Sequence, residues 1–201
     1  MTHTPAPRPL KLVDPTGTRQ ADDEDPRVHV MKSMMMDRGW LVNSYAQVEF
    51  LLGDLIWQLR SFPEYSTELH AFPLSLDGRV ARVTEFCQRD GPLRAHSNDI
   101  LPLFDRLAQL DEGRQFFVHG YCAFYSTPAG DMAMQFRRFV PPAKGEKKGP
   151  VRRKDLIVRP AELAAARDRW ALFADTSMKI FRGVYQALRL EEPDLLPIER
   201  A

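Results

Sequence analysis

The sequence has few of the features that mark secreted, metal-binding or membrane proteins. Its 201 residues include only two cysteines, Cys87 and Cys122, without CxxC spacing, so neither a disulfide framework nor a zinc site is indicated. No apolar run reaches the roughly 18 residues of a membrane span, and the N-terminus lacks the basic-then-apolar order of a signal peptide. We therefore expect a cytoplasmic protein with no membrane association, no metal and no cofactor.

The net charge is also small, at +1, but its distribution is uneven. Between Arg137 and Arg159, nine basic residues stand against Glu146 and Asp155, a local charge of +7, so the remainder carries −6. Such a stretch is typical either of a solvated loop or of a surface that binds a polyanion. The candidate nucleic-acid-binding residues are Lys147, Lys148, Arg152, Arg153 and Lys154.

Hydrophobic residues make up 44% of the chain, which is enough for one core. Residues 1–28 contain five prolines and an acidic run, and are predicted to form a disordered N-terminal tail. Residues 191–201 are predicted to form a loose C-terminal tail. We therefore expect a single domain over residues 29–190.

Apolar residues that recur every three or four positions predict a first long helix over Trp40–Ser61. Further apolar residues make its apolar stripe wider than one face, so we expect this helix to be covered on two sides, by its own domain and by a second subunit. The stripe consists of Leu41, Tyr45, Val48, Leu52, Leu55 and Leu59.

Three more helices and a small sheet are expected. A second helix is predicted over Gly78–Asp90 with Asp77 as its cap. A third helical region is predicted to open near Leu93, and Pro102 favours a helix start near Leu101, with Asn98 or Asp99 as the cap and Pro102 in the first turn. Alternating residues predict a hairpin of 121–126 and 132–140, a basic loop, and a short strand over 151–158. The last helix is predicted from Pro160 to about Leu190. The predicted fold is thus mainly all-α, with a small β-hairpin insertion over about 121–158 before the last helix.

The motif that carries chemistry is Arg114-x4-His119-Gly120 at the end of the third helix. Arginine is a permanent cation that can bind a phosphate through two donors, and histidine can transfer a proton near neutral pH, so the pair suits phosphodiester cleavage without a metal. The apolar rhythm of the helix assigns Arg114 to a buried position, which is costly unless an anion meets it. That anion could be Asp111, Glu112, Glu49 or a phosphate.

Glu49 lies on the apolar first helix, one turn after Tyr45. A buried carboxylate needs a partner. Glu49 could bind a neighbouring tyrosine, arginine or backbone group, or it could orient the motif arginine or histidine. On an ideal helix, Arg114 and His119 lie about 7.5 Å apart along the axis and about 140° apart around it. Their convergence would need a reaching arginine, a distorted last turn, or residues from two subunits.

The order of these parts resembles the HEPN superfamily, whose hallmark is an Arg-x4-6-His motif near the end of a helix. The resemblance covers roughly residues 37–190 and includes Tyr45 and Glu49 on the first helix. Members commonly have Asn, Asp or His after the arginine, where this chain has Gln115, which could add a hydrogen bond. The resemblance implies a helical bundle that pairs as a homodimer, with the motifs of both subunits facing a shared cleft.

Two functions follow from this resemblance. Many HEPN proteins are metal-independent endoribonucleases of toxin, antiphage or RNA-processing systems, in which the partners are RNA and, for a toxin, an antitoxin protein. In that case His119 would transfer a proton, Arg114 would stabilise phosphoryl charge, and Gln115, Glu49 and Tyr45 would support them. The alternative is a catalytically silent dimeric module that binds a protein or nucleotide partner, with Arg114 in a structural ion pair. His119 near a helix C-terminus is also a favourable structural arrangement through the helix dipole.

Overall fold

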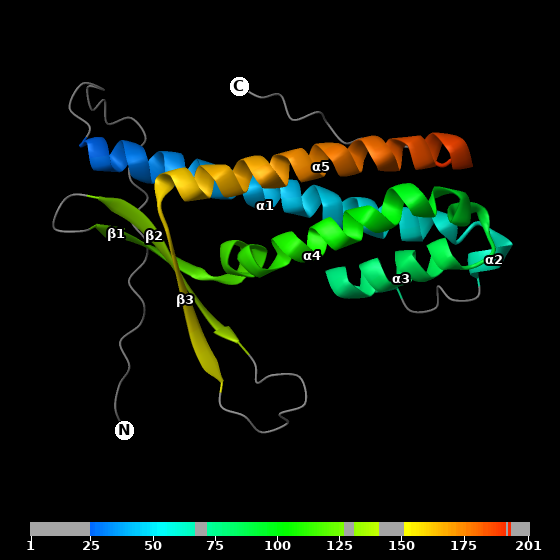
Figure 1. Cartoon of the computed structure of the whole chain (residues 1–201), viewed down its shortest axis with the longest axis horizontal. Coiled ribbons are helices and arrows are strands. Elements are labelled where there is room, and N and C mark those ends of the chain that lie inside the picture. The colour runs from blue at the N-terminus through cyan, green and yellow to red at the C-terminus, as the bar shows by residue number, and fades with distance from the viewer. Residues whose placement is uncertain (1–24, 67–71, 127–130, 141–150, 192, 194–201) are drawn as a thin grey trace, which may run out of the picture.

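The computed structural model describes residues 25–66, 72–126, 131–140, 151–191 and 193, and shows a mainly helical protein with one small sheet (Figure 1). The two longest helices, α1 and α5, lie side by side, with α3 and α4 packed along one end and the sheet near the other. The helices are α1 Pro26–Leu59, α2 Pro63–Ser66, α3 Leu76–Gln88, the 3-10 helix η2 Pro92–His96, α4 Ser97–His119 and α5 Pro160–Leu188.

Helix α1 begins at Pro26, 14 residues before the predicted start at Trp40. The side chain of Asp25 caps it by accepting a hydrogen bond of 2.9 Å from the backbone N–H of Arg27, and proline suits the first helical position because its missing N–H would have no partner there. The buried Asp37 then forms an ion pair with Arg167 of α5. The helix therefore includes residues 26–28, which the sequence assigned to the tail, while residues 1–24 lie outside the described residues.

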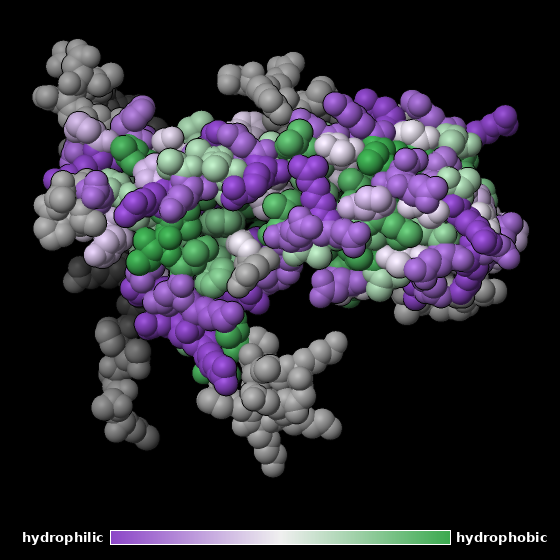
Figure 2. All heavy atoms as spheres, viewed as in Figure 1, coloured by the Kyte–Doolittle hydropathy of each residue, from purple (hydrophilic) through white to green (hydrophobic). Residues whose placement is uncertain are grey.

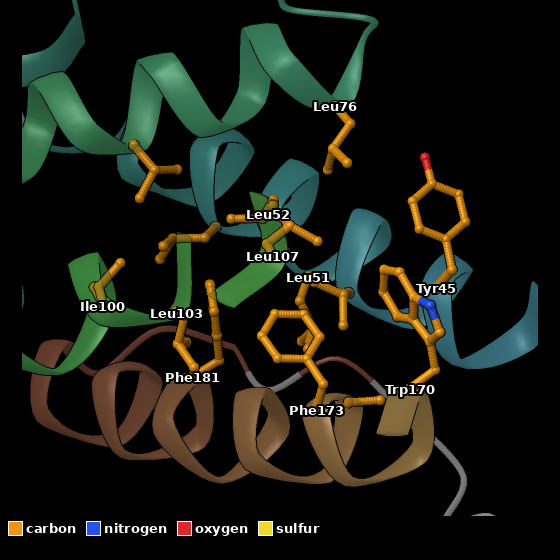
Figure 3. Packing of buried hydrophobic residues seen from close by; sticks show 14 of the residues in the cluster. Tyr45, Leu51, Leu52, Leu76, Ile100, Leu103, Leu107, Trp170, Phe173 and Phe181 are labelled. Carbon is orange, nitrogen blue, oxygen red and sulfur yellow. The ribbon is translucent and has the colours of Figure 1, made fainter. Parts of the chain in front are cut away.

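The core fills the space between α1, α5 and α4 (Figure 3). All six residues of the predicted α1 stripe are buried, which confirms the helical spacing. They pack against Trp170, Phe173 and Phe181 of α5 and against a row of apolar side chains on α4, of which Ile100 is fully buried. Side chains of this size stabilise a fold by about 1.5–3 kcal/mol each when they leave water, so this core holds the helix pair together.

The starts of α3 and α4 differ from the predictions by a few residues. The cap of α3 is Ser75, whose hydroxyl accepts a hydrogen bond of 3.1 Å from the backbone N–H of Gly78, while Asp77 lies inside the first turn. Helix α4 begins at Ser97, directly after η2, so Pro102 lies in its second turn. The reason is that η2 is anchored by the buried Leu93, whose N–H donates to the Tyr65 hydroxyl at 3.0 Å.

The sheet consists of three antiparallel strands in the order β1-β2-β3. Strands β1 Tyr121–Ser126 and β2 Met132–Val140 confirm the predicted hairpin, and β3 Arg152–Val158 confirms the third strand. One face of β2 carries the buried Met134 and Phe136, and the Phe136 ring meets that of Phe117 on α4 edge to face at 5.1 Å. The sheet therefore packs against the end of α4 that carries the Arg114 motif.

Arg38 of α1 joins this end of α4 to the sheet. Its Nε donates to the carbonyl of Phe117 at 2.9 Å, and its Nη1 donates to the Cys122 sulfur on β1 at 3.0 Å. Within the described part of the chain, every helix is too short or too polar to span a membrane.

Candidate functional site

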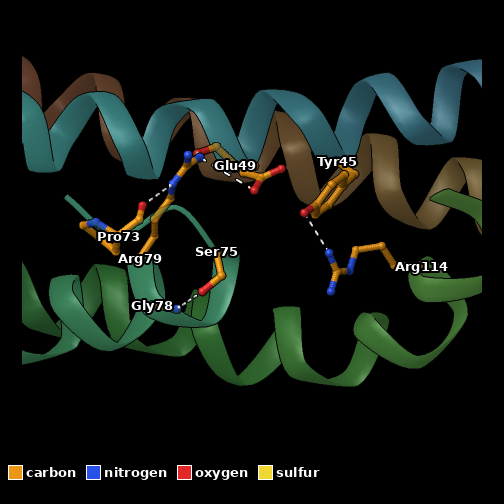
Figure 4. A network of polar contacts seen from close by, with 7 residues as sticks. All are labelled: Tyr45, Glu49, Pro73, Ser75, Gly78, Arg79 and Arg114. Carbon is orange, nitrogen blue, oxygen red and sulfur yellow. Dashed lines mark hydrogen bonds and ion pairs between the residues drawn. The ribbon is translucent and has the colours of Figure 1, made fainter. Parts of the chain in front are cut away.

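Arg114 is buried inside the protomer, at 4% exposure, on the side of α4 that faces α1. Its Nη1 donates a hydrogen bond of 2.7 Å to the Tyr45 hydroxyl, and its guanidinium carbon lies 4.7 Å from the centre of the Tyr45 ring (Figure 4). Its Nη2 forms an ion pair with Asp111, one turn earlier on α4. Arg114 therefore occupies a buried position, as the spacing of apolar residues along the helix predicted. Its anionic partner there is Asp111.

Tyr45 is the residue that joins α1, α4 and α5 at this point. Its ring meets that of Trp170 on α5 edge to face, with the centres 5.8 Å apart. Burial and a hydrogen bond to the Glu49 side chain together raise the pKa of the Tyr45 hydroxyl to about 12, against the lowering effect of Arg114. Tyr45 therefore stays protonated at neutral pH and accepts from Arg114 while it donates to Glu49.

Glu49 is half-buried, with 28% of its side chain exposed, and its ionic partner is Arg79 of α3, at 3.7 Å. Arg79 also donates to the Glu49 main-chain carbonyl at 2.8 Å and to the Pro73 carbonyl at 3.2 Å (Figure 4). The partners of Glu49 are thus an arginine and a tyrosine, the types of partner named in the first of the two roles left open for it. Glu49 approaches Arg114 only through Tyr45.

His119 is exposed and ends α4, so it does not share the buried environment of Arg114. The last turn is regular, since the Gly120 N–H donates to the Phe116 carbonyl at 2.9 Å, and α4 continues through Gly113 without interruption. Because the helix is undistorted, its geometry keeps the two motif residues about 140° apart. Gln115 is partly exposed. One protomer therefore does not bring Arg114 and His119 together.

Gly120 has a steric role in this motif. A Cβ at this position would lie 2.4 Å from the Phe116 carbonyl oxygen, far inside van der Waals contact. Glycine allows the chain to leave α4 and enter β1 directly, which is a structural reason for the His-Gly ending.

Comparison with known protein families, curated proteins and solved structures finds no match to this chain. The HEPN resemblance therefore stays a prediction.

The predicted nucleic-acid-binding residues do not share one face. Arg152, Arg153 and Lys154 follow one another along the exposed β3, so Arg153 points to one side of the sheet, while Arg152 and Lys154 point to the other. Lys147 and Lys148 lie outside the described residues. The described residues also contain no group of three or more His, Cys, Asp or Glu side chains arranged to hold a metal ion.

Sequence reasoning predicted that the first helix would be covered on two sides, but it did not predict which residues of two apolar surfaces stay exposed. One is an uncharged side of α1, which the seven-residue spacing of Met36, Asn43, Phe50 and Trp57 could have indicated. The other is the outer face of the sheet, where alternation along β1 places Tyr121 and Tyr125 on one side. In both surfaces, the missing information was which apolar residues the core leaves exposed.

Proposed function

We propose that this protein is a homodimeric binding module of HEPN-like type in which Arg114 is structural. The observation that carries the proposal is the position of Arg114, which is buried and bound to Tyr45 and Asp111, while His119 is exposed elsewhere on α4. A phosphate could engage this guanidinium only at the expense of those contacts, and breaking a buried ion pair is strongly unfavourable. This arrangement favours the silent module over the ribonuclease.

The surface that supports pairing is the exposed side of α1, which we call the α1 strip. Between Met35 and Trp57, every exposed residue of this helix is uncharged, and Asn43 is the one polar residue among them. Charge is depleted at the cores of protein interfaces and aromatic residues are enriched there, which is the composition seen here. The strip consists of Met35, Met36, Gly39, Trp40, Asn43, Ala46, Phe50 and Trp57.

The α1 strip suits a second copy of itself. It extends about 33 Å along the helix, with Ala46 at its centre. In a two-fold symmetric pair the same patch meets itself, so two antiparallel α1 helices would cross at Ala46, where a small side chain permits close approach. Each Trp57 would then lie opposite the methionine end of the partner's strip. A hollow of about 500 Å³ beside Phe50 and Trp57 could receive those flexible side chains.

The first test is the mass of the purified full-length chain in solution. We expect multi-angle light scattering to give twice the chain mass of 23.1 kDa at micromolar concentration. A single-chain mass over the whole range from micromolar to hundreds of micromolar would contradict the proposal, because an apolar strip of this kind would then be exposed in the free protein without a partner.

The predicted endoribonuclease remains the second candidate, because two observations favour it. His119 is accessible to a substrate, and the Nε of Arg114 is buried without a hydrogen-bond partner among the described residues. Under the proposed function we expect no cleavage of total RNA in EDTA, and no difference between the wild type and His119→Ala. Metal-independent cleavage that falls by roughly 100- to 10,000-fold in His119→Ala, the usual contribution of a positioned acid or base, would instead establish the ribonuclease. Single-stranded DNA is the matched control substrate, which a ribonuclease of this type should not cleave because DNA lacks the 2′-hydroxyl nucleophile.

A further inference from the structure

The outer face of the sheet carries exposed aromatic side chains. Residues in register point to the same side of a sheet, and the register places Tyr121 beside Arg137, Tyr125 beside Ala133, and Phe139 beside Arg153. This side lies opposite the core side formed by Met134 and Phe136. Tyr121 is 68% exposed and Phe139 is 73% exposed, so neither ring contributes much to the core.

These rings form one surface with neighbouring polar and apolar groups. Tyr121 and Phe139 are diagonal neighbours on adjacent strands, a placement that puts their Cα atoms about 7–8 Å apart. Tyr125 lies four residues along β1, about 13 Å from Tyr121, and Ile157 is exposed on β3. We call Tyr121, Tyr125, Phe139 and Ile157 the aromatic face. In Figure 2, hydrophobic and hydrophilic side chains lie next to each other over the sheet.

Two cations of the sheet, Arg137 and Arg153, lie on the aromatic face, together with the acid Asp155. The other basic residues of the strands, Arg138, Arg152 and Lys154, point to the opposite side. Arg137 donates to the Gln135 side chain at 2.7 Å, and Arg153 lies 3.1 Å from Asp155, so both guanidinium groups are oriented along the surface. Each guanidinium has five N–H donors, so donors remain for a further ligand.

The charge of the aromatic face favours an anionic occupant. Among the strand residues on this side, two arginines, Arg137 and Arg153, stand against one acid, Asp155. A second copy of this face would add two more arginines, whereas the uncharged α1 strip provides a surface for self-association. Charge complementarity therefore indicates a polyanion as the occupant.

Flat exposed rings beside arginines suit unpaired bases linked by phosphates. Bases of every type stack on aromatic side chains, and basic side chains beside those rings contact the phosphates of the nucleic-acid backbone. A duplex keeps its bases stacked inside and offers the rings no partner. We propose that the aromatic face binds single-stranded nucleic acid, with Tyr121, Tyr125 and Phe139 stacking on bases and Arg137 and Arg153 contacting phosphates. This inference deepens the proposed function, because it names the ligand of the binding module, but it does not depend on how the dimer forms.

Fluorescence anisotropy with the full-length chain tests this inference. The probes are a labelled single-stranded RNA of mixed sequence, about 12 nucleotides long, the same sequence as DNA, and the corresponding duplex. We expect both single strands to bind more tightly than the duplex. The difference in affinity between the RNA strand and the DNA strand then measures the contribution of the 2′-hydroxyl. Equal or tighter binding of the duplex, or no binding of any probe at low salt, would overturn the proposal.

Variants separate stacking from general charge attraction. Replacing Tyr121 and Phe139 together by alanine is expected to weaken binding by roughly tenfold or more, because each stacked base depends on one ring. Tyr121→Phe should retain binding, since it keeps the ring. The matched control is Leu172→Ala, an apolar residue of α5 with 55% exposure, which should leave binding unchanged. Unchanged affinity in the double alanine variant would overturn stacking.

Light scattering on the same samples distinguishes this inference from the proposed function. The sheet variants should keep the mass of the wild type. If the wild type is a dimer that binds no single strand, the inference fails and the dimer stands. If the wild type is a monomer that binds through Tyr121 and Phe139, the inference stands and the dimer fails.

Discussion

Replacing Phe50 and Trp57 together by glutamate is expected to convert the dimer into a monomer. Both side chains are half exposed, at 50% and 52%, and lie on the same edge of α1, two turns apart. Buried aromatic anchors typically contribute 2 kcal/mol or more each to an interface, so their loss is expected to weaken association by about 4 kcal/mol, roughly a thousandfold. The glutamates add a further penalty, because pairing would bury unpaired charges. Light scattering at micromolar concentration would show the change as a halved mass.

The control for this prediction is Ile157→Glu, which places the same charge at a position with 53% exposure on the sheet instead of α1. It should keep the dimer. Circular dichroism should show native helix content for both proteins, since the core beneath the α1 strip is unchanged. If the double glutamate variant keeps the dimer mass, the α1 strip is not the interface, even if the wild type is dimeric.

Arg114→Ala is expected to lower the free energy of unfolding by about 2–4 kcal/mol, because it removes one partner of a mostly buried ion pair and leaves the Tyr45 hydroxyl without its donor. The expected loss of unfolding free energy is smaller than that for a fully buried ion pair, because 36% of the Asp111 side chain is exposed. For a chain of this size the loss corresponds to a fall of roughly 5–15 °C in melting temperature. Urea denaturation with linear extrapolation is the measurement.

Two variants control the Arg114 experiment. His119→Ala changes an exposed side chain and is expected to shift the free energy of unfolding by less than about 0.5 kcal/mol. Tyr45→Phe keeps the ring against Trp170 and removes only the hydroxyl, so a loss of about 1 kcal/mol is expected. An Arg114→Ala protein as stable as the wild type would show that the guanidinium is not part of the core, and would favour the ribonuclease.

Local sequence patterns correctly predicted those helices and strands whose sequence signals lie entirely within their own segment. Strands β1 and β2 have the predicted bounds because alternation and the turn residues between them are local features. The start of α1 was predicted too late, although Asp25 as cap and Pro26 at the first position are local start signals. The part of α1 before Trp40 is joined to α5 by the long-range pair of Asp37 and Arg167, which no local pattern indicates. Similarly, α3 is capped by Ser75 and not by Asp77. Serine and aspartate are both good N-cap residues, so residue type alone could not distinguish the two positions.

For the candidate site, spacing alone established that Arg114 occupies a core position and that Arg114 and His119 lie on different sides of an ideal helix. Both conclusions are properties of one helix, so its period is sufficient to reach them. The sequence left open Asp111, Glu112, Glu49 or a phosphate as the partner of Arg114. The anion is Asp111, which lies one turn earlier on the same helix. Tertiary structure decided against Glu49, because the packing of α3 against α1 pairs Glu49 with Arg79, and it added the Tyr45 hydroxyl as a second partner of Arg114.

The sequence by itself thus determined the mainly helical class, the hairpin and the buried stripe of α1, since each follows from a period of two or of three to four residues. Tertiary structure alone decided which apolar residues stay exposed. Phe50 and Leu52 are both apolar residues of α1, yet only Leu52 is buried, because α5, α3 and α4 cover one part of the helix and leave the other uncovered. Exposure depends on what distant segments cover, and a local pattern carries no information about that.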